Sequence, residues 1–105
     1  MLNELQGNLQ TRDIRYWRDK QQHEIDFILA RRNQVPIAVE CKWSERQFDP
    51  RNLNAFRRAY PKGANYLVCH DVNRAFVRNL GGLQVSVLSL PELIQRLTHL
   101  FGREP

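Results

Sequence analysis

Three charged side chains stand in two runs of residues that otherwise have the composition of buried strands. Asp26 lies within EIDFIL, and Glu40 and Lys42 lie near the end of VPIAVECKW. A buried ion without a partner is strongly destabilising, so these positions require an explanation. Neighbouring strands run about 4.8 Å apart, which would let the carboxylates of Asp26 and Glu40 meet. Two adjacent carboxylates repel each other, and a hard divalent cation such as Mg²⁺ or Mn²⁺ would relieve that repulsion.

The residues around these carboxylates fit phosphodiester hydrolysis. A cation held by Asp26, Glu40 and the backbone carbonyl of Cys41 would also neutralise a phosphate oxygen. Lys42 follows Glu40 by two residues, so its ammonium would lie over the same site and could orient an attacking water or stabilise charge developing on phosphorus. The pattern therefore predicts Asp26, Glu40 and Lys42 as catalytic residues.

Three strands are predicted to position these residues. Residues 14–18 and 24–30 flank the polar stretch 19–22, a pattern typical of a hairpin. Residues 35–43 are mostly apolar before Glu40, as expected of a central strand that is covered on both faces. The three strands should therefore lie side by side.

Side-chain alternation predicts which residues share a face of each strand. Along the central strand, Ala38, Glu40 and Lys42 should lie on one face. The residues expected on the other face are Val35, Ile37, Val39, Cys41 and Trp43. The same alternation places Asp26 with Glu24 and Ile28.

A helix is predicted to begin at Pro50. Asp49 is a favourable N-cap residue, and Phe48 is placed to pack onto Leu53 across the first turn. Pro61 and Gly63 should end the helix. Its expected buried stripe consists of Leu53, Phe56 and Tyr60. The basic residues expected near or on its open face, where they could line a phosphate track or simply be solvated, are Arg51, Arg57 and Arg58.

The remaining segments complete an α/β domain. A short amphipathic helix is predicted at the N-terminus from the spacing of Leu2, Leu5 and Leu9. Further strands are expected at 65–70 and, after the Gly81-Gly82 turn, at 83–88, whereas 74–80 has a weaker pattern. Ser89 and Glu92 have capping-box spacing and introduce a last helix, whose apolar residues are Leu93, Leu97 and Leu100 or Phe101. The order predicts one domain over residues 1–105, with a mixed sheet flanked by helices.

Composition narrows the function classes. The net charge is +5, and most of the 16 Lys and Arg residues are Arg, whose guanidinium matches phosphate oxygens. Nucleic acid is therefore an expected partner. A basic surface can also serve solubility alone. Cys41 and Cys69 lie within apolar runs and are expected to be small buried side chains without a disulfide or zinc role. No run approaches 18 apolar residues, which predicts a cytoplasmic protein with no membrane segment.

The motif EID followed by ECK resembles the PD-(D/E)XK nuclease superfamily, which places an acidic residue before a Glu-x-Lys or Asp-x-Lys strand. More specifically, YWRDKQQHEIDFIL followed by VPIAVECKWSE resembles the C-terminal, DUF4143-like domain of unknown function that follows the ATPase module in prokaryotic AAA+-type ATPases. The corresponding residues are Tyr16, Trp17, Arg18, Asp26, Glu40 and Lys42. The resemblance implies a restriction-endonuclease-like αβββαβ core, a Mg²⁺ or Mn²⁺ cofactor and an ATPase partner.

Three departures from these patterns bear on activity. The chain has no GxxxxGK[ST] phosphate loop, so it cannot hydrolyse ATP by that route. The first helix is shorter than in the family pattern, and Glu4 is the acidic residue left there that could join the metal ligands. Ile25 stands where the superfamily name has Pro.

Two function classes remain open from the sequence. The first is a metal-dependent nuclease-like domain, and the second is a non-catalytic interaction module in which the charged residues form a structural ion-pair cluster. Trp17 and Trp43 could stack on bases, but aromatic residues in strands more often lie in the core. The histidines, His23, His70 and His99, lack common ligand spacing, although His23 could end near the metal. The oligomeric state is left open.

Overall fold

A computed structural model describes residues 14–30 and 34–101, with side chains up to residue 98. The helix predicted from Leu2, Leu5 and Leu9, together with Glu4, lies outside the described residues. The elements are β1 (Ile14–Arg18), β2 (Glu24–Leu29), β3 (Ile37–Lys42), the 3-10 helix η2 (Glu45–Gln47), α2 (Pro50–Ala59), β4 (Asn65–Cys69), β5 (Phe76–Leu80), β6 (Leu83–Leu88) and α3 (Leu90–Phe101).

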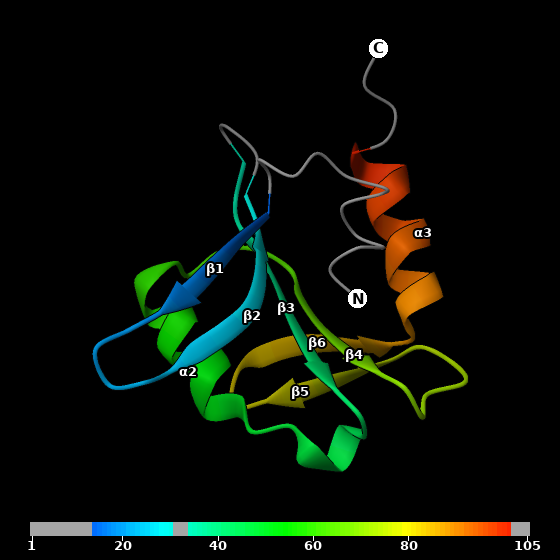
Figure 1. Cartoon of the computed structure of the whole chain (residues 1–105), viewed down its shortest axis with the longest axis horizontal. Coiled ribbons are helices and arrows are strands. Elements are labelled where there is room, and N and C mark those ends of the chain that lie inside the picture. The colour runs from blue at the N-terminus through cyan, green and yellow to red at the C-terminus, as the bar shows by residue number, and fades with distance from the viewer. Residues whose placement is uncertain (1–13, 31–33, 102–105) are drawn as a thin grey trace.

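The six strands form one mixed sheet with the order β1-β2-β3-β4-β6-β5. The first three strands are an antiparallel meander, and β4 then pairs parallel to β3 after α2 has crossed over the sheet (Figure 1). β6 continues the parallel part beside β4, and β5 closes the far edge antiparallel to β6. The prediction of an α/β domain with a mixed sheet is confirmed.

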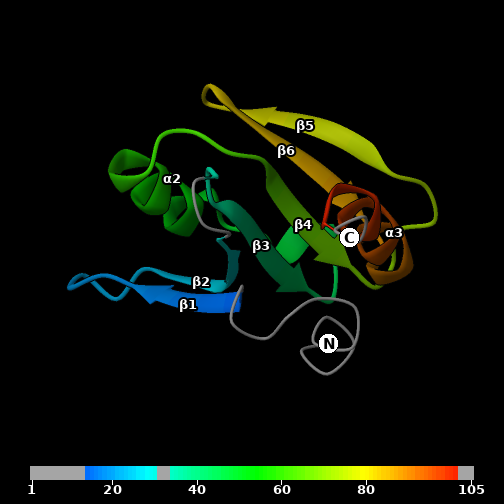
Figure 2. The same cartoon turned by 90° about the horizontal axis from the view of Figure 1, so that it is seen from above.

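The two long helices lie on opposite faces of the twisted sheet (Figure 2). On one face, Leu53 and Phe56 of α2 pack with Ile25, Ile28, Ala38, Leu67, Cys69, Val85 and Val87. On the other face, Leu93 and Leu97 of α3 pack with Leu29, Ile37, Val39, Tyr66, Val68 and Leu88. Strands β3 and β4 contribute to both clusters, which explains why their sequences are apolar at consecutive positions.

Helix α2 begins as predicted. The carboxylate of Asp49 accepts the backbone N–H of Arg51 at 3.0 Å, Pro50 occupies the first turn, and Phe48 packs in the same cluster as Leu53. The prediction that Tyr60 is buried is wrong, because the side chain is 48% exposed. Tyr60 is the C-cap residue with non-helical dihedrals, so helical periodicity no longer directs its side chain inward.

The central strand is shorter than the predicted 35–43. Val35 is 51% exposed and precedes β3, whereas Trp43 follows it and is 68% exposed, so the prediction that Trp43 lies in the core is wrong. The strand predictions at 24–30 and 65–70 are each one residue too long. Trp17 is half-buried and packs edge-on against Phe56 at 5.2 Å between ring centroids, as expected for a residue bordering the core.

The weak pattern at 74–80 contains the edge strand β5, which turns at Gly81-Gly82 into β6. Ser89 then caps the last helix, where its hydroxyl accepts the backbone N–H of Glu92 at 3.4 Å. Neither α2 nor α3, nor any other helix in the described part of the chain, is long and apolar enough to cross a membrane.

Candidate functional site

A β-bulge in β2 determines where Asp26 lies. Arg15 pairs with Ile28 and Trp17 with Ile25, so the single β1 residue between them is matched by two residues of β2. Ile25 and Ile28 consequently face the same α2-side cluster although they are three residues apart. The strict alternation predicted along this strand therefore breaks between Ile25 and Ile28, because a bulge inserts one residue and interrupts the two-residue period.

The bulge lets the carboxylates of Asp26 and Glu40, which we call the carboxylate pair, bridge β2 and β3. The regular pairing of the two strands runs from Leu29 and Ile37 to Phe27 and Val39. At the next position the backbone N–H of Asp26 donates to Glu40 Oε1 at 3.2 Å, and the backbone N–H of Cys41 donates to Asp26 Oδ2 at 2.8 Å. The sequence prediction that Asp26 and Glu40 meet agrees with this geometry.

Glu40 is buried to an unusual degree for a carboxylate. The residue is 3% exposed, and Oε2 is buried without a hydrogen-bond partner among the described residues. Burial, together with the charge of Asp26, raises the pKa of the Glu40 carboxyl to about 7. A group in this state is stabilised by gaining either a proton or a cation.

Lys42 lies at the end of β3, opposite Cys69 of β4, and is half-buried. Its positive charge opposes the increase in the pKa of Glu40. The pKa of Asp49 is lowered mainly by its hydrogen bonds with Arg51 and, to a smaller extent, by the charge of Lys42. Cys41 packs against the α3-side cluster, and burial raises the pKa of its thiol to about 12. A protonated thiol is a poor ligand for a hard cation, so the prediction for Cys41 rests on its backbone carbonyl.

The described part of the chain contains no group of three or more His, Cys, Asp or Glu side chains arranged around one cation position. Asp26 and Glu40 are brought together, whereas Glu4 lies outside the described residues. Neither Cys41 nor Cys69 is joined in a disulfide among the residues that the structure describes.

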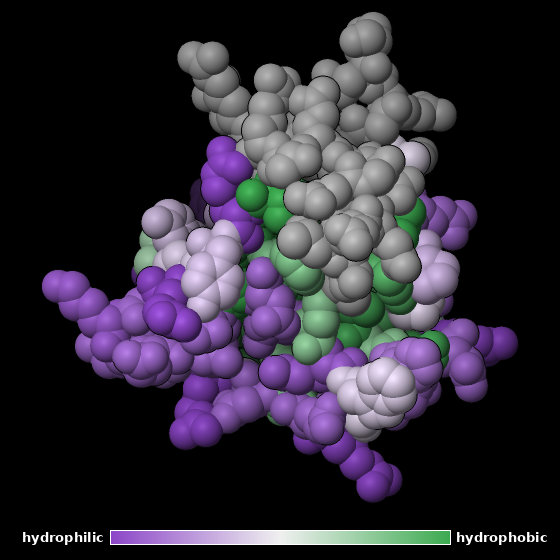
Figure 3. Space-filling view, viewed as in Figure 1, coloured by the Kyte–Doolittle hydropathy of each residue, from purple (hydrophilic) through white to green (hydrophobic). Residues whose placement is uncertain are grey.

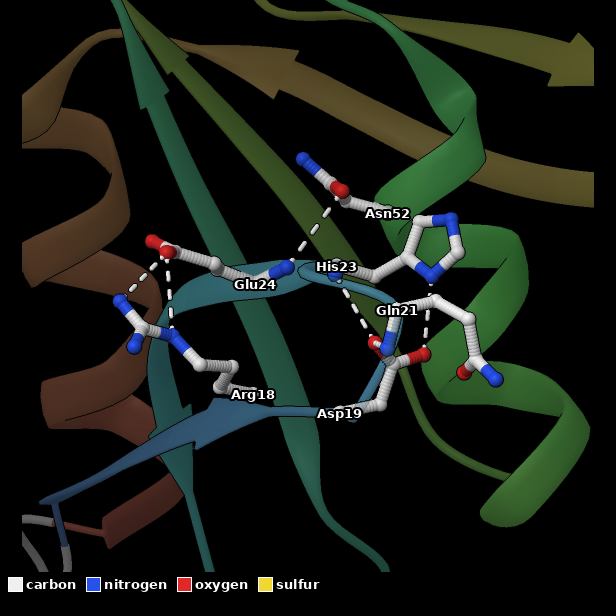
Figure 4. Close-up of polar contacts among 6 residues, drawn as sticks. All are labelled: Arg18, Asp19, Gln21, His23, Glu24 and Asn52. Atoms are coloured by element: carbon white, nitrogen blue, oxygen red, sulfur yellow. Dashed lines mark hydrogen bonds and ion pairs between the residues drawn. The ribbon is translucent and has the colours of Figure 1, made fainter.

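Polar side chains of the β1–β2 hairpin are held by one another (Figure 4). Asp19 accepts the backbone N–H groups of Gln21 and His23 and contacts His23 Nδ1 at 2.8 Å. Arg18 pairs with Glu24 at 2.8 Å. His23 therefore orders the turn, and Glu24 neutralises a neighbouring arginine.

The predicted placement of Arg57 on the open face of α2 is wrong. The residue is 6% exposed, and its guanidinium donates to the carbonyls of Tyr60, Lys62, Pro36 and Ala64 and to Asn65 Oδ1. These acceptors lie where the chain leaves α2 and enters β4, so Arg57 ties that connection to the start of β3. It is not available to bind phosphate.

The other two arginines of α2 are exposed. Arg51 forms an ion pair with Asp49 at 2.6 Å, which holds the pKa of the Asp49 carboxyl below its usual value. Arg58 is exposed on the outer face of the helix. Figure 3 shows hydrophilic residues over the β1–β2 hairpin and the lower edge of the molecule, while apolar residues are visible between β3 and α3.

Sequence reasoning missed one pair of residues at the carboxyl ends of the parallel strands. The rings of Trp43 and His70, which we call the aromatic pair, stack with centroids 4.2 Å apart and planes inclined by 14°. They border a hollow of about 570 Å³ whose lining includes Lys42 and Ser89. No local signal predicts this pair, since each residue follows a different strand and β3 and β4 must first pair in register.

The fold and this site together define an α/β domain with a mixed sheet and two carboxylates shared between adjacent strands. The model of the family described as a domain of unknown function, DUF4143, matches residues 1–93, so the chain belongs to this family. Comparisons with curated proteins and with solved structures gave no match.

Proposed function

We propose that this chain is a metal-dependent nuclease-like domain that hydrolyses nucleic-acid phosphodiesters. The observation that supports it best is Glu40 Oε2, a carboxylate oxygen that is buried without a hydrogen-bond partner among the described residues, beside Asp26. An uncompensated buried carboxylate is costly, and a divalent cation would neutralise both carboxylates at once.

The chemistry of these oxygen atoms fits Mg²⁺ or Mn²⁺. Asp26, Glu40 and the carbonyl of Cys41 would hold the cation, and Glu4 is proposed as a further ligand. Hard divalent cations prefer carboxylate and carbonyl oxygens together with water. When bound, such a cation lowers the pKa of a coordinated water and neutralises a phosphate oxygen.

Lys42 is the proposed positioning and charge-stabilising residue. It follows Glu40 by two residues on β3, and its charge already influences the pKa of Glu40. An ammonium in this position can orient an attacking water or stabilise negative charge on the phosphoryl oxygens. Asp26 and Glu40 remain fixed by the hydrogen bonds that join β2 to β3.

The topology is compatible with membership of the PD-(D/E)XK superfamily. A meander of three strands, a helix and a strand parallel to the third correspond to the βββαβ part of the restriction-endonuclease-like αβββαβ core. The residues that would form the first helix are outside the described part. The basic composition, including the exposed residues Arg51 and Arg58, supports nucleic acid as the substrate, and we further propose an ATPase as a partner.

A second function is supported by a different observation. The carboxylates of Asp26 and Glu40 already accept backbone N–H groups across the two strands, which is a structural role that needs no metal. In this alternative the domain is a catalytically inactive module that binds nucleic acid or protein, and Glu40 is stabilised by a proton.

Metal titration separates the two functions. Mg²⁺ and Mn²⁺ are added to the purified chain while its melting temperature is followed, with wild type beside Asp26→Asn and Glu40→Gln. A ligand that binds only the folded state stabilises it by about 2.7 kcal/mol at a hundredfold excess over its dissociation constant. For a domain of this size we expect the melting temperature of wild type to rise by roughly 10 °C or more.

Both variants retain an oxygen acceptor for the backbone N–H groups, so the strands should remain joined. Glu92→Gln on α3 is the matched control for loss of one carboxylate, and it should respond to metal as wild type does. A Lys42→Ala variant should bind metal but lose most nuclease activity. If the cations leave wild type unchanged, the metal-dependent function fails and the binding module is favoured.

A further inference from the structure

We propose that the aromatic pair, Trp43 and His70, is a stacking platform for an unpaired nucleobase. This inference rests on the proposed function, since it specifies the substrate of the same site as single-stranded nucleic acid or a frayed strand end. It is carried by the geometry of the two rings and by their position beside Lys42.

The first observation that supports this proposal is the open face of Trp43. The side chain is 68% exposed even though one face of its indole lies on the His70 ring at 4.2 Å. The opposite face of the indole is therefore open to water. A flat apolar surface of this kind is favourable for stacking of a nucleobase, whatever the base, because every base has a π face.

The backbone fixes the platform before any ligand binds. Lys42 and Cys69 are partners in the parallel register of β3 and β4, so the residues that follow the two strands, Trp43 and His70, also lie next to each other. The backbone N–H of His70 donates to the carbonyl of Trp43 at 3.2 Å, which holds the two residues side by side. Since the rings are already ordered, binding a base costs little further side-chain entropy.

Lys42 links the platform to the carboxylate pair. Lys42 is one of the residues that line the hollow of about 570 Å³ bordered by the aromatic pair, and its charge also acts on Glu40. A base on Trp43 would therefore bring its strand to the end of β3 that carries Lys42. Stacking and charge together would select a strand whose base is free to leave its neighbours.

Duplex nucleic acid fits this platform less well. Each base inside a duplex is already stacked on both faces, and extracting it requires unstacking and unpairing. An unpaired base has no such cost. The platform therefore predicts a preference for single strands that depends on Trp43.

The test is fluorescence anisotropy with labelled oligonucleotides of about 20 nucleotides, a length that covers the site sizes of single-strand binders. The probes are oligothymidylate, oligouridylate, a blunt duplex and an abasic strand, all in EDTA. We expect Trp43→Ala to weaken single-strand binding about 5- to 100-fold, and Trp43→Phe to retain most of it. The abasic strand should bind wild type weakly, and its affinity should be unchanged in Trp43→Ala.

Tyr60→Ala is the matched control. Tyr60 is also an exposed aromatic residue, at 48%. It is the C-cap residue of α2 and is not among the residues that line the hollow beside the aromatic pair. Its affinity for single strands should stay within about twofold of wild type, as expected for a residue outside the interface. Melting curves establish that each variant is folded. Tryptophan emission of wild type should also change on binding oligothymidylate or oligouridylate, which tests the platform without any substitution.

Two results would overturn the platform: a Trp43→Ala affinity equal to that of Tyr60→Ala, or an equal loss for duplex and single strand. A loss of affinity of Trp43→Ala for oligothymidylate, oligouridylate or both supports the platform and identifies the strand type. Because EDTA removes divalent cations, the result is independent of cleavage. If binding depends on Trp43 but metal does not stabilise the protein, the nuclease proposal is refuted and the platform is kept. If the protein cleaves nucleic acid with metal but binding does not depend on Trp43, the platform is refuted and the nuclease proposal is kept.

Discussion

A carboxyl group whose pKa is raised by burial binds a proton in the folded state over a pH range in which the unfolded chain has already lost it. For Glu40 this range extends from the ordinary value of 4.5 to about 7. Below this pH range the carboxyl of Glu40 is protonated in both the folded and the unfolded state, and above the range it is ionised in both. Between the two values the folded state binds more protons, so its stability falls as pH rises.

Glu40→Gln should remove this pH dependence. We expect the wild type to lose roughly 3 kcal/mol relative to the variant between about pH 4.5 and 7, and the difference to stay constant at higher pH. Melting temperatures of both proteins in EDTA, measured between about pH 5 and 8, provide the comparison. The groups with lowered pKa values, Asp19, Glu24 and Asp49, contribute stability that is lost as pH falls, and their contribution cancels in the difference.

A difference between the two melting temperatures that is independent of pH would contradict the raised pKa of Glu40. Saturating Mg²⁺ provides the complementary measurement. If the carboxylate pair binds the cation, the wild type should keep its stability above about pH 7, because the ionised form of Glu40 is then compensated.

At the scale of elements, the connection between α2 and β4 depends on Gly63. Its φ is +134°, and a Cβ atom there would lie 2.0 Å from the carbonyl oxygen of Pro36 and 2.9 Å from Arg57 Nη1. Both the backbone conformation and the lack of space therefore require glycine. Pro61 and Gly63 were predicted to end the helix, but the close approach to Pro36 depends on the neighbouring strand.

Gly63→Ala should destabilise the domain by about 3 kcal/mol or more, since it adds a clash with backbone to an unfavourable φ. Gly81→Ala is the matched control, because Gly81 also has a positive φ, of +57°, but its Cβ atom would meet nothing within 4 Å. That substitution should cost roughly 1–2 kcal/mol. Urea denaturation of both variants measures the difference, and equal losses would refute the proposed clash.

At the scale of the whole molecule, Arg57 joins three elements across one end of the sheet. Its side chain extends from α2 and donates hydrogen bonds to the turn after the helix and to the residues just before β3 and β4. Asn65 extends this network by donating its side-chain N–H to the carbonyl of Gln84 in β6. The guanidinium therefore supplies donors to the carbonyls of the crossover, of which that of Ala64 also accepts the backbone N–H of Ala38.

Arg57→Ala should destabilise the domain by about 3–5 kcal/mol, because it leaves several acceptors without a donor. Arg58→Ala, at the next position but exposed, should change stability by no more than about 0.5 kcal/mol. Urea denaturation separates the two outcomes. A small loss for Arg57→Ala would mean that water replaces the guanidinium.

Local patterns predicted most of the elements. The N-cap and proline before α2, the alternation along β3 and the glycine turn before β6 all act through neighbours in the chain, and the structure has these elements within about two residues of their predicted bounds. The meeting of Asp26 and Glu40 was predictable for the same reason, since a hairpin followed by a short connection makes their strands adjacent.

The sequence by itself thus determined the fold class and the carboxylate pair. Only the tertiary structure decided the β2 bulge, the burial of Arg57 and Tyr60's exposure. It also brought Trp43 beside His70, which depends on the parallel register of β3 and β4. The physical reason is that periodicity and caps are properties of consecutive residues, whereas burial, bulges and stacking depend on which distant segments lie against each other.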